Sequence, residues 1–258
     1  MDGLRSFGEL IRANKRTLIV LGAAILFLFV LMDVMGDDIA HLDSTAYVFF
    51  VLHLRRTWLT PIMQSFSGIA SPVVLAVMIL VVEAFAPGRR PGICAGINLV
   101  LSVGLCLVLK EIVQRERPAE SIRLVSETGY SFPSGHSMVA MAFFGFLMWM
   151  VLHYEEDRIV KILCTLGFAC VILLIGMSRV YLGVHYLSDV LAGFLVTVVW
   201  LGFFTRTIAP LLLDERKPAA EIAVEPVAEA AAVGVPAGVP HNDGKDSQPD
   251  QSQQVGES

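Results

Sequence analysis

Two apolar stretches, IVKILCTLGFACVILLIGM at residues 159–177 and YLSDVLAGFLVTVVWLGFF at residues 186–204, decide the fold of this 258-residue chain. A helix that crosses the hydrocarbon core of a bilayer needs about 20 mostly apolar residues, and both stretches approach that length. Four similar stretches precede them, at residues 17–35, 61–82, 93–109 and 138–152, the last reaching span length if it begins near Ser134. We therefore predict an all-α, polytopic membrane protein in which six transmembrane helices form a bundle.

The composition agrees with this prediction. The chain is 55% hydrophobic and 17% charged, with a mean hydropathy of +0.67, whereas a soluble domain is about 45–50% apolar and about 25% charged. The four cysteines lie in or beside the apolar stretches without C-x-x-C spacing, which indicates apolar packing rather than a metal site or disulfides. The composition therefore argues against a soluble globular enzyme and for an integral membrane protein.

The sequence divides into three parts that differ in hydrophobicity and charge. Residues 1–16 form a polar, basic N-terminal segment, and residues 17–206 form the membrane domain, whose first span lacks a cleavage pattern and is expected to be retained. Residues 207–258 form a tail without aromatic residues, which we expect to be largely disordered. The net charge of −5 arises within residues 217–258, which hold seven acidic and two basic residues. The neutral remainder excludes neither an anionic substrate nor a basic active site.

The placement of Lys and Arg predicts the orientation, because cytoplasmic loops carry an excess of both. With both termini in the cytoplasm, the inner segments hold twelve basic residues and the outer segments seven. Four of the outer seven lie in one loop, residues 110–123. Residues 46–54 are apolar but too short to span, so we expect them to lie at the membrane interface or to cover the bundle. The compact form suggests a bacterial inner membrane.

Three polar segments, residues 110–118, 133–136 and 178–189, fall on the outer side in this topology. They carry the cations Lys110, Arg117 and Arg179. A single cation at a membrane surface is often an anchor for lipid headgroups, but three cations with two histidines nearby are better suited to the oxygens of a phosphoryl group. Ser134 is placed to cap the helix that follows it, where free N–H groups attract anions, and Gly135 allows close approach of the backbone.

Two histidines and one aspartate complete this set. His185 and Asp189 are four residues apart at the start of the last span, which places them on one helical face. Asp189 could then accept the Nδ1–H of His185 and leave Nε2 free to attack. His136, at the start of a helix, could protonate a leaving oxygen. The alternative is two histidines held by backbone hydrogen bonds. No catalytic role is assigned to the other histidines, His41, His53, His153 and His241.

The motifs K-x6-R-P, P-S-G-H and S-R-x5-H-x3-D, complete and in this order, resemble the signature of the type 2 phosphatidic acid phosphatase (PAP2) family. These lipid phosphate phosphatases are related to vanadium haloperoxidases. The resemblance covers residues 45–204 and implies a haloperoxidase-like helical core. A soluble haloperoxidase or acid phosphatase is excluded by the six spans.

The resemblance also implies a role for each motif residue. His185 would be the nucleophile that forms a phosphohistidine, Asp189 would orient it, and His136 would be the general acid. The residues that would hold the phosphate oxygens are Lys110, Arg117, Ser134, Gly135 and Arg179. Fixed cations would neutralise the developing charge, so neither a metal nor another cofactor is implied.

We therefore expect an integral membrane phosphatase that hydrolyses a lipid phosphate or diphosphate. Undecaprenyl diphosphate, phosphatidic acid, phosphatidylglycerophosphate and diacylglycerol diphosphate remain open as substrates. One alternative is a lipid phosphotransferase that uses the same site, and another is a non-catalytic transporter or scaffold. The expected partners are the bilayer and the lipid, without nucleic acid, and the sequence leaves the oligomeric state open.

Overall fold

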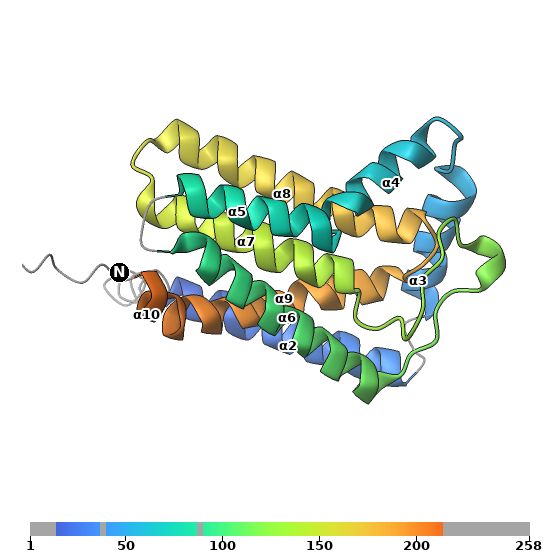
Figure 1. The fold of residues 1–258 in the computed structure, drawn as a ribbon. Coiled ribbons are helices and arrows are strands. Elements are labelled where there is room, and N and C mark those ends of the chain that lie inside the picture. Colours follow the sequence, from blue (N-terminus) through green and yellow to red (C-terminus); the bar gives the residue numbers. More distant parts are fainter. Residues whose placement is uncertain (1–13, 37–39, 87–89, 214–258) are drawn as a thin grey trace, which may run out of the picture. The chain divides into compact units, whose positions relative to one another are not determined.

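The protein was analysed as a computed structural model that describes residues 14–36, 40–86 and 90–213. All regular structure in these ranges is helical, which confirms the all-α prediction (Figure 1). In chain order the elements are α2 (Lys15–Met35), α3 (Ala40–Tyr47), the π-helix η1 (Val48–His53), α4 (Leu59–Ile69), α5 (Pro72–Phe85), α6 (Pro91–Val113), the 3₁₀ turn η2 (Glu120–Ile122), α7 (Gly135–Tyr154), α8 (Arg158–Tyr181), α9 (Leu187–Thr207) and α10 (Ala209–Leu213).

Five helices in the described ranges, α2, α6, α7, α8 and α9, are each long and apolar enough to cross a membrane. The remaining predicted span, the second in chain order at residues 61–82, corresponds to a pair of helices, α4 and α5, that together are long and apolar enough to cross a membrane and that meet at an angle of 55°. The break has a local cause. Pro72 begins α5, and Ser71 before it has an extended ψ of 148°, as the ring of a following proline requires.

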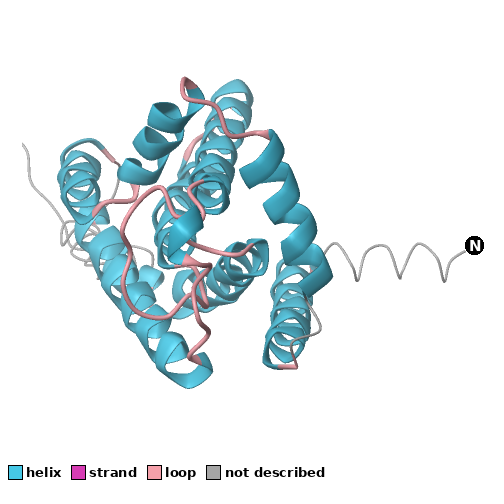
Figure 2. Cartoon of the chain, turned by 90° about the vertical axis from the view of Figure 1, so that its right-hand side faces the viewer, coloured by secondary structure: helices cyan, strands magenta, loops and turns pink. Residues whose placement is uncertain are grey.

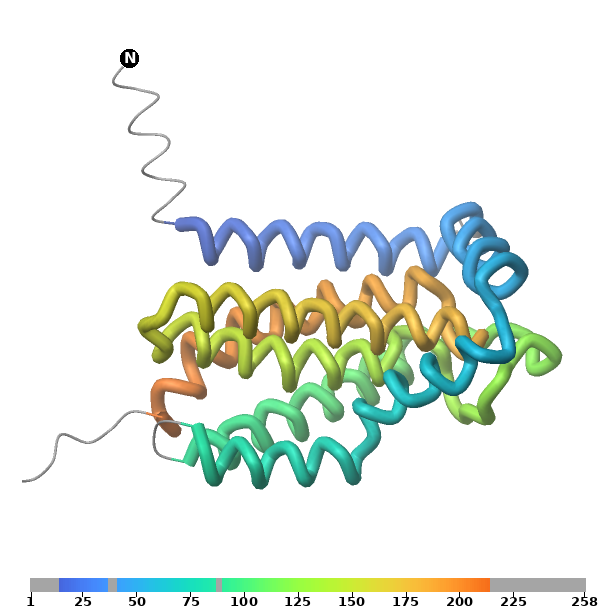
Figure 3. The backbone as a smooth tube through the Cα atoms, turned by 90° about the horizontal axis from the view of Figure 1, so that it is seen from above, coloured from blue at the N-terminus to red at the C-terminus, as the bar shows by residue number. Residues whose placement is uncertain are grey.

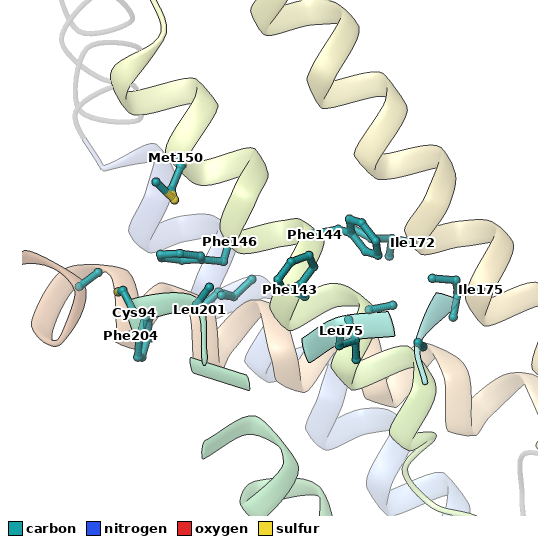
Figure 4. Packing of buried hydrophobic residues seen from close by; sticks show 14 of the residues in the cluster. Leu75, Cys94, Phe143, Phe144, Phe146, Met150, Ile172, Ile175, Leu201 and Phe204 are labelled. Carbon is teal, nitrogen blue, oxygen red and sulfur yellow. The ribbon is translucent and has the colours of Figure 1, made fainter. Parts of the chain in front are cut away.

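Helix α7 lies at the centre of the bundle and packs against α6, α8 and α9. Its buried face carries aromatic side chains, among them Phe143 and Phe146, which meet Leu201 and Phe204 of α9 (Figure 4). Large apolar side chains on the outer faces of the helices are exposed, as Ile25 and Leu163 are, in the way expected of side chains that face lipid. The core is therefore confined to the middle of the bundle.

Helix α2 packs along α9 (Figure 3). The side chain of Val20 on α2 packs against Gly202 of α9, where an added Cβ would lie 2.4 Å from Val20 Cγ2. At the same contact Arg16 donates a hydrogen bond to the hydroxyl of Thr205. Helix α10 continues the packed part of the chain to Leu213, beyond the predicted boundary at residue 207. The predictions for residues 1–13 and 214–258 lie outside the described residues.

Residues 46–54, predicted to lie at the interface or to cover the bundle, form the end of α3 and the π-helix η1. Both elements pack against α8, and α3 also packs against α9. They lie at the end of the bundle where α6 and α8 finish and where α7 and α9 begin (Figure 1). Viewed from that end, the connecting loops gather over the helix termini (Figure 2). All three polar segments of the sequence meet here.

Candidate active site

His185 and Asp189 lie next to each other, but not on one helical face as the sequence predicted. Helix α9 begins at Leu187, so His185 belongs to the turn that precedes it. Asp189 is in the first turn of α9, and its Oδ2 accepts the backbone N–H of Tyr186 at 2.9 Å. This cap turns the carboxylate back towards the preceding loop. As a result, His185 Nδ1 lies 3.4 Å from Asp189 Oδ2.

The contacts of the His185 ring determine its tautomer. Arg117 Nη1 lies 3.1 Å from Nε2, and a guanidinium can only donate, so Nε2 carries the lone pair. Nδ1 then carries the hydrogen and faces Asp189 and, at 3.4 Å, the hydroxyl of Ser131. Burial lowers the pKa of His185 to about 4, which the neighbouring Asp189 only partly offsets. The ring is therefore neutral at physiological pH, with Nε2 as its basic atom.

Arg117 is held by backbone carbonyls. Its guanidinium donates to the oxygens of Gly129 at 2.9 Å, Thr128 at 3.0 Å and Val184 at 3.0 Å. Burial lowers the pKa of Arg117, but an arginine remains charged. These bonds hold a cation against Nε2 of His185, where a phosphoryl group would have to bind.

The other two predicted cations come from the ends of two helices. Lys110, in the last turn of α6, donates to the carbonyl oxygen of Tyr130. Arg179, in the last turn of α8, is 2% exposed and donates to the hydroxyl of Ser67 on α4 and to the carboxylate of Glu127. Its Nε has no hydrogen-bond partner among the described residues. Arg179 thus retains a donor that no described protein group uses.

The P-S-G-H segment forms the start of α7. Ser134 is the N-cap residue by position, yet its side chain caps no N–H; its Oγ accepts from Ser137 at 2.9 Å. Its backbone N–H donates to the carbonyl of Asp189 at 3.0 Å, which ties α7 to α9. At Gly135 an added Cβ would meet only Cys106 Sγ at 3.6 Å, an ordinary contact. No protein atom therefore requires glycine at this position, and a close approach of the backbone there would have to be to a ligand.

A cavity of about 350 Å³ collects most of the predicted residues. Its wall includes Lys110, Arg117, Glu127, Gly135, His136 and His185. A smaller cavity of about 190 Å³ shares His136 and Glu127 with it and is also lined by Arg179. No group of His, Cys, Asp and Glu side chains within residues 14–36, 40–86 and 90–213 is arranged to hold a metal ion.

Sequence reasoning missed Glu127. Its carboxylate pairs with Arg179 and lies 3.8 Å from Nη2 of Arg117, so it bridges two of the predicted phosphate-binding cations. Burial alone would raise the pKa of Glu127, but Arg179, His136 and Arg117 together outweigh burial and lower it. Glu127 lies between motifs, in a loop without periodicity, and only the surplus of basic residues around it hinted at a partner.

Sequence reasoning also missed the groups behind Asp189. Arg115 Nη1 lies 2.6 Å from Asp189 Oδ1, and the Ser131 hydroxyl donates to Oδ2. In the sequence, Arg115 is one of the four basic residues of the loop 110–123, and it is not a fixed position of any of the three motifs. Since Asp189 is fully buried, these donors meet the need of a buried carboxylate for partners.

Comparisons with known proteins find relatives of this chain. The model of the PAP2 superfamily matches residues 91–211. Phosphatidylglycerophosphatase B of Bacillus subtilis is 32% identical over 150 residues, which are 55% of this chain and 71% of that protein. Human dolichyldiphosphatase 1 is 30% identical over 126 residues, 44% of this chain and 53% of that protein, so the chain spans about half of its length.

A solved structure shows the same fold. The crystal structure of a transmembrane PAP2-type phosphatidylglycerolphosphate phosphatase from Bacillus subtilis aligns with a TM-score of 0.66 and 27% identity, over 76% of this chain and 98% of that one. The part of the chain that matches the family model, residues 91–211, contains all three motifs. The chain therefore belongs to the PAP2 superfamily.

Proposed function

We propose that this multi-pass membrane protein hydrolyses a lipid phosphate or diphosphate by way of a phosphohistidine at His185. The observation that carries the proposal is the neutral His185 ring, whose Nδ1 faces Asp189 and whose Nε2 meets Arg117 at the cation-lined cavity. Nucleophilic catalysis needs this combination of an available lone pair, an orienting carboxylate and cations for the oxygens of the reacting phosphorus.

In the first half-reaction, Nε2 forms a bond to phosphorus while the bond from phosphorus to the leaving oxygen breaks. Arg117 gives up its hydrogen bond to Nε2 and donates to a phosphoryl oxygen, together with Lys110 and Arg179. The ring becomes cationic, and Asp189 stabilises it through the Nδ1 hydrogen. His136 supplies a proton to the leaving alcohol or, for a diphosphate, to the leaving phosphate.

In the second half-reaction, water attacks the phosphorus. His136, now neutral, takes a proton from the water as the new P–O bond forms and the P–N bond breaks. The electron pair of that bond returns to Nε2, and phosphate is released. Both half-reactions use fixed cations of the protein, so activity is expected to persist in the presence of a chelator.

The substrate is proposed to keep its tail in the bilayer while its phosphate reaches the end of the bundle. The names of the relatives, a phosphatidylglycerophosphatase and a dolichyldiphosphatase, support phosphatidylglycerophosphate and polyprenyl diphosphates, of which undecaprenyl diphosphate is the bacterial form. Phosphatidic acid and diacylglycerol diphosphate are further candidates. We place the site on the outer face of a bacterial inner membrane, with both termini in the cytoplasm, because the basic residues favour that orientation.

The test is phosphate release from a panel of these lipids by the purified protein in detergent, with and without EDTA. We expect His185→Asn and His136→Asn to lose more than about 99% of the activity, since removing a nucleophile or general acid costs at least two orders of magnitude. His53→Asn is the matched control, because His53 is exposed and its Nδ1 lies 3.0 Å from the carbonyl oxygen of Val48 in its own helix. Full activity of His185→Asn would contradict the proposal. Assays with an added acceptor alcohol separate hydrolysis from phosphotransfer.

A further inference from the structure

The carboxylate behind His185 is itself held by a second acid through one arginine. Arg115 Nη1 lies 2.6 Å from Asp189 Oδ1, and Arg115 Nη2 lies 2.8 Å from Asp43 Oδ2. The guanidinium stacks 4.2 Å above the ring of Tyr186. Asp189 is fully buried and Asp43 is 6% exposed, so Arg115 joins two carboxylates inside the protein.

Asp43 also binds the first turn of α9 directly. Its Oδ1 accepts the backbone N–H of Ser188 at 2.9 Å, and its Oδ2 accepts the Ser188 hydroxyl at 2.6 Å. Arg115 Nη1 donates to the same hydroxyl at 2.7 Å. Asp43 lies on α3, outside residues 91–211 that match the superfamily model. A segment outside that match thus reaches the residue next to Asp189.

Because of these contacts, the two oxygens of Asp189 bind different partners. Oδ1 is taken by Arg115, which leaves Oδ2 for His185, Ser131 and the N–H of Tyr186. A carboxylate can rotate about its last bond, but a guanidinium held at both ends by acids prevents that rotation. Burial lowers the pKa of Arg115, yet Asp189 and Asp43 outweigh burial and raise it, so the bridge stays charged.

Arg115 does not line the 350 Å³ cavity that collects Lys110, Arg117 and both histidines; with Asp43 and His185 it lines another cavity, of about 790 Å³, which none of these cations or His136 lines. Its charge is shared between two buried carboxylates, which leaves little of it for a phosphate. We propose that Arg115, fixed by Asp43, is a positioning residue: it sets the rotation of Asp189, and thereby the tautomer and direction of the His185 ring. This inference rests on the proposed function, and it assigns α3 a role in catalysis.

The test compares Arg115→Gln, Arg115→Lys and Asp43→Asn in the full-length protein in detergent. We expect Arg115→Gln to lower kcat at least tenfold, while KM and the inhibition constant for inorganic phosphate change less than threefold. Arg115→Lys keeps a positive charge for Asp189 but loses the forked guanidinium that joins two carboxylates. The kcat of Arg115→Lys should therefore lie between that of Arg115→Gln and that of the wild type. Asp43→Asn should also lower kcat. The loss of kcat in the double variant should be smaller than the product of the two single losses, because both residues act on Asp189 through one bridge.

Arg123→Gln is the matched control. Arg123 lies in the same loop and is 17% exposed against 18% for Arg115, but its acidic partner, Glu120, is 92% exposed. Wild-type kcat in Arg115→Gln, alongside an inactive His185→Asn, would refute the positioning role and leave the proposed function intact. Loss of phosphate inhibition in parallel with kcat would also refute it, because Arg115 would then bind the substrate. Should Arg115→Gln fail to fold, Arg115→Lys and Asp43→Asn test the same inference.

Discussion

The substitution Glu127→Gln should make the site bind phosphate more tightly. In the substrate-free protein the Glu127 carboxylate pairs with Arg179 and lies 3.8 Å from Arg117 Nη2. A phosphoryl group must compete with this carboxylate for both cations and must also approach its negative charge. Glutamine keeps the shape and one hydrogen-bonding oxygen but removes the charge.

The magnitude follows from the contacts. A hydrogen bond between charged groups is worth about 1.5–3 kcal/mol when buried, and much less at the surface. The Glu127 side chain is 26% exposed and Arg179 is 2% exposed, so the pair lies between these limits but nearer the buried one. If the Glu127 carboxylate opposes anion binding by about 1–2 kcal/mol, its neutralisation makes an anion bind roughly five- to thirtyfold more tightly.

The assay is competitive inhibition of phosphate release by vanadate and by inorganic phosphate at neutral pH. Glu120→Gln is the control, because Glu120 lies in the same loop but is 92% exposed and 3.9 Å from Arg123, and its inhibition constants should stay within twofold of the wild type. Unchanged inhibition constants in Glu127→Gln would refute the competition. Weaker inhibition would show instead that Glu127 holds Arg179 in its binding position.

Four further predictions concern pH and packing. Burial lowers the pKa of His185 from 6.5 to about 4. The acidic limb of the profile of kcat/KM against pH should therefore lie well below pH 6. An acidic limb near pH 6.5 would contradict the buried neutral ring. Because the pKa of His185 is lower in the folded protein, the imidazole of the unfolded chain is protonated at a higher pH than that of the folded chain. The free energy of unfolding should therefore decrease as the pH falls from about 6.5 towards 4, and unfolding in denaturant can measure this decrease. Gly202→Val should lower the free energy of unfolding by about 1–3 kcal/mol, because even a Cβ at this position would lie 2.4 Å from Val20. An unshifted melting temperature would argue against the close α2–α9 contact. Asn98→Leu should cost about 1–3 kcal/mol of stability, since it removes the partner that lies 2.8 Å from the Trp200 indole nitrogen, and the activity of the folded fraction should stay unchanged.

The spans could be predicted from sequence because lipid imposes one rule on all of them. A helix that crosses the bilayer must be long and apolar, and α2, α6, α7, α8 and α9 all meet that rule in composition alone. The break between α4 and α5 was missed although Pro72 signals it, because hydropathy averaged over a window does not register one residue.

The motif residues were found because the ends of spans are few and their polar side chains stand out against apolar neighbours. The start of α9 was misplaced by one or two residues, because the capping interaction between Asp189 and the Tyr186 N–H excludes His185 from the helix. Glu127 and Asp43 could not be assigned, since their partners are set by how loops fold over the bundle, and neither position has a periodicity that points to one.

The central claim is that His185 Nε2 accepts the phosphoryl group. Rapid mixing of the purified protein with substrate labelled in the reacting phosphate, quenched in alkali to preserve a P–N bond, tests it most directly. We predict a labelled protein that is stable in alkali and labile in acid, a peptide phosphorylated at His185, and no label in His185→Asn. Label on any other residue, or steady turnover in a variant that lacks His185, would contradict the account.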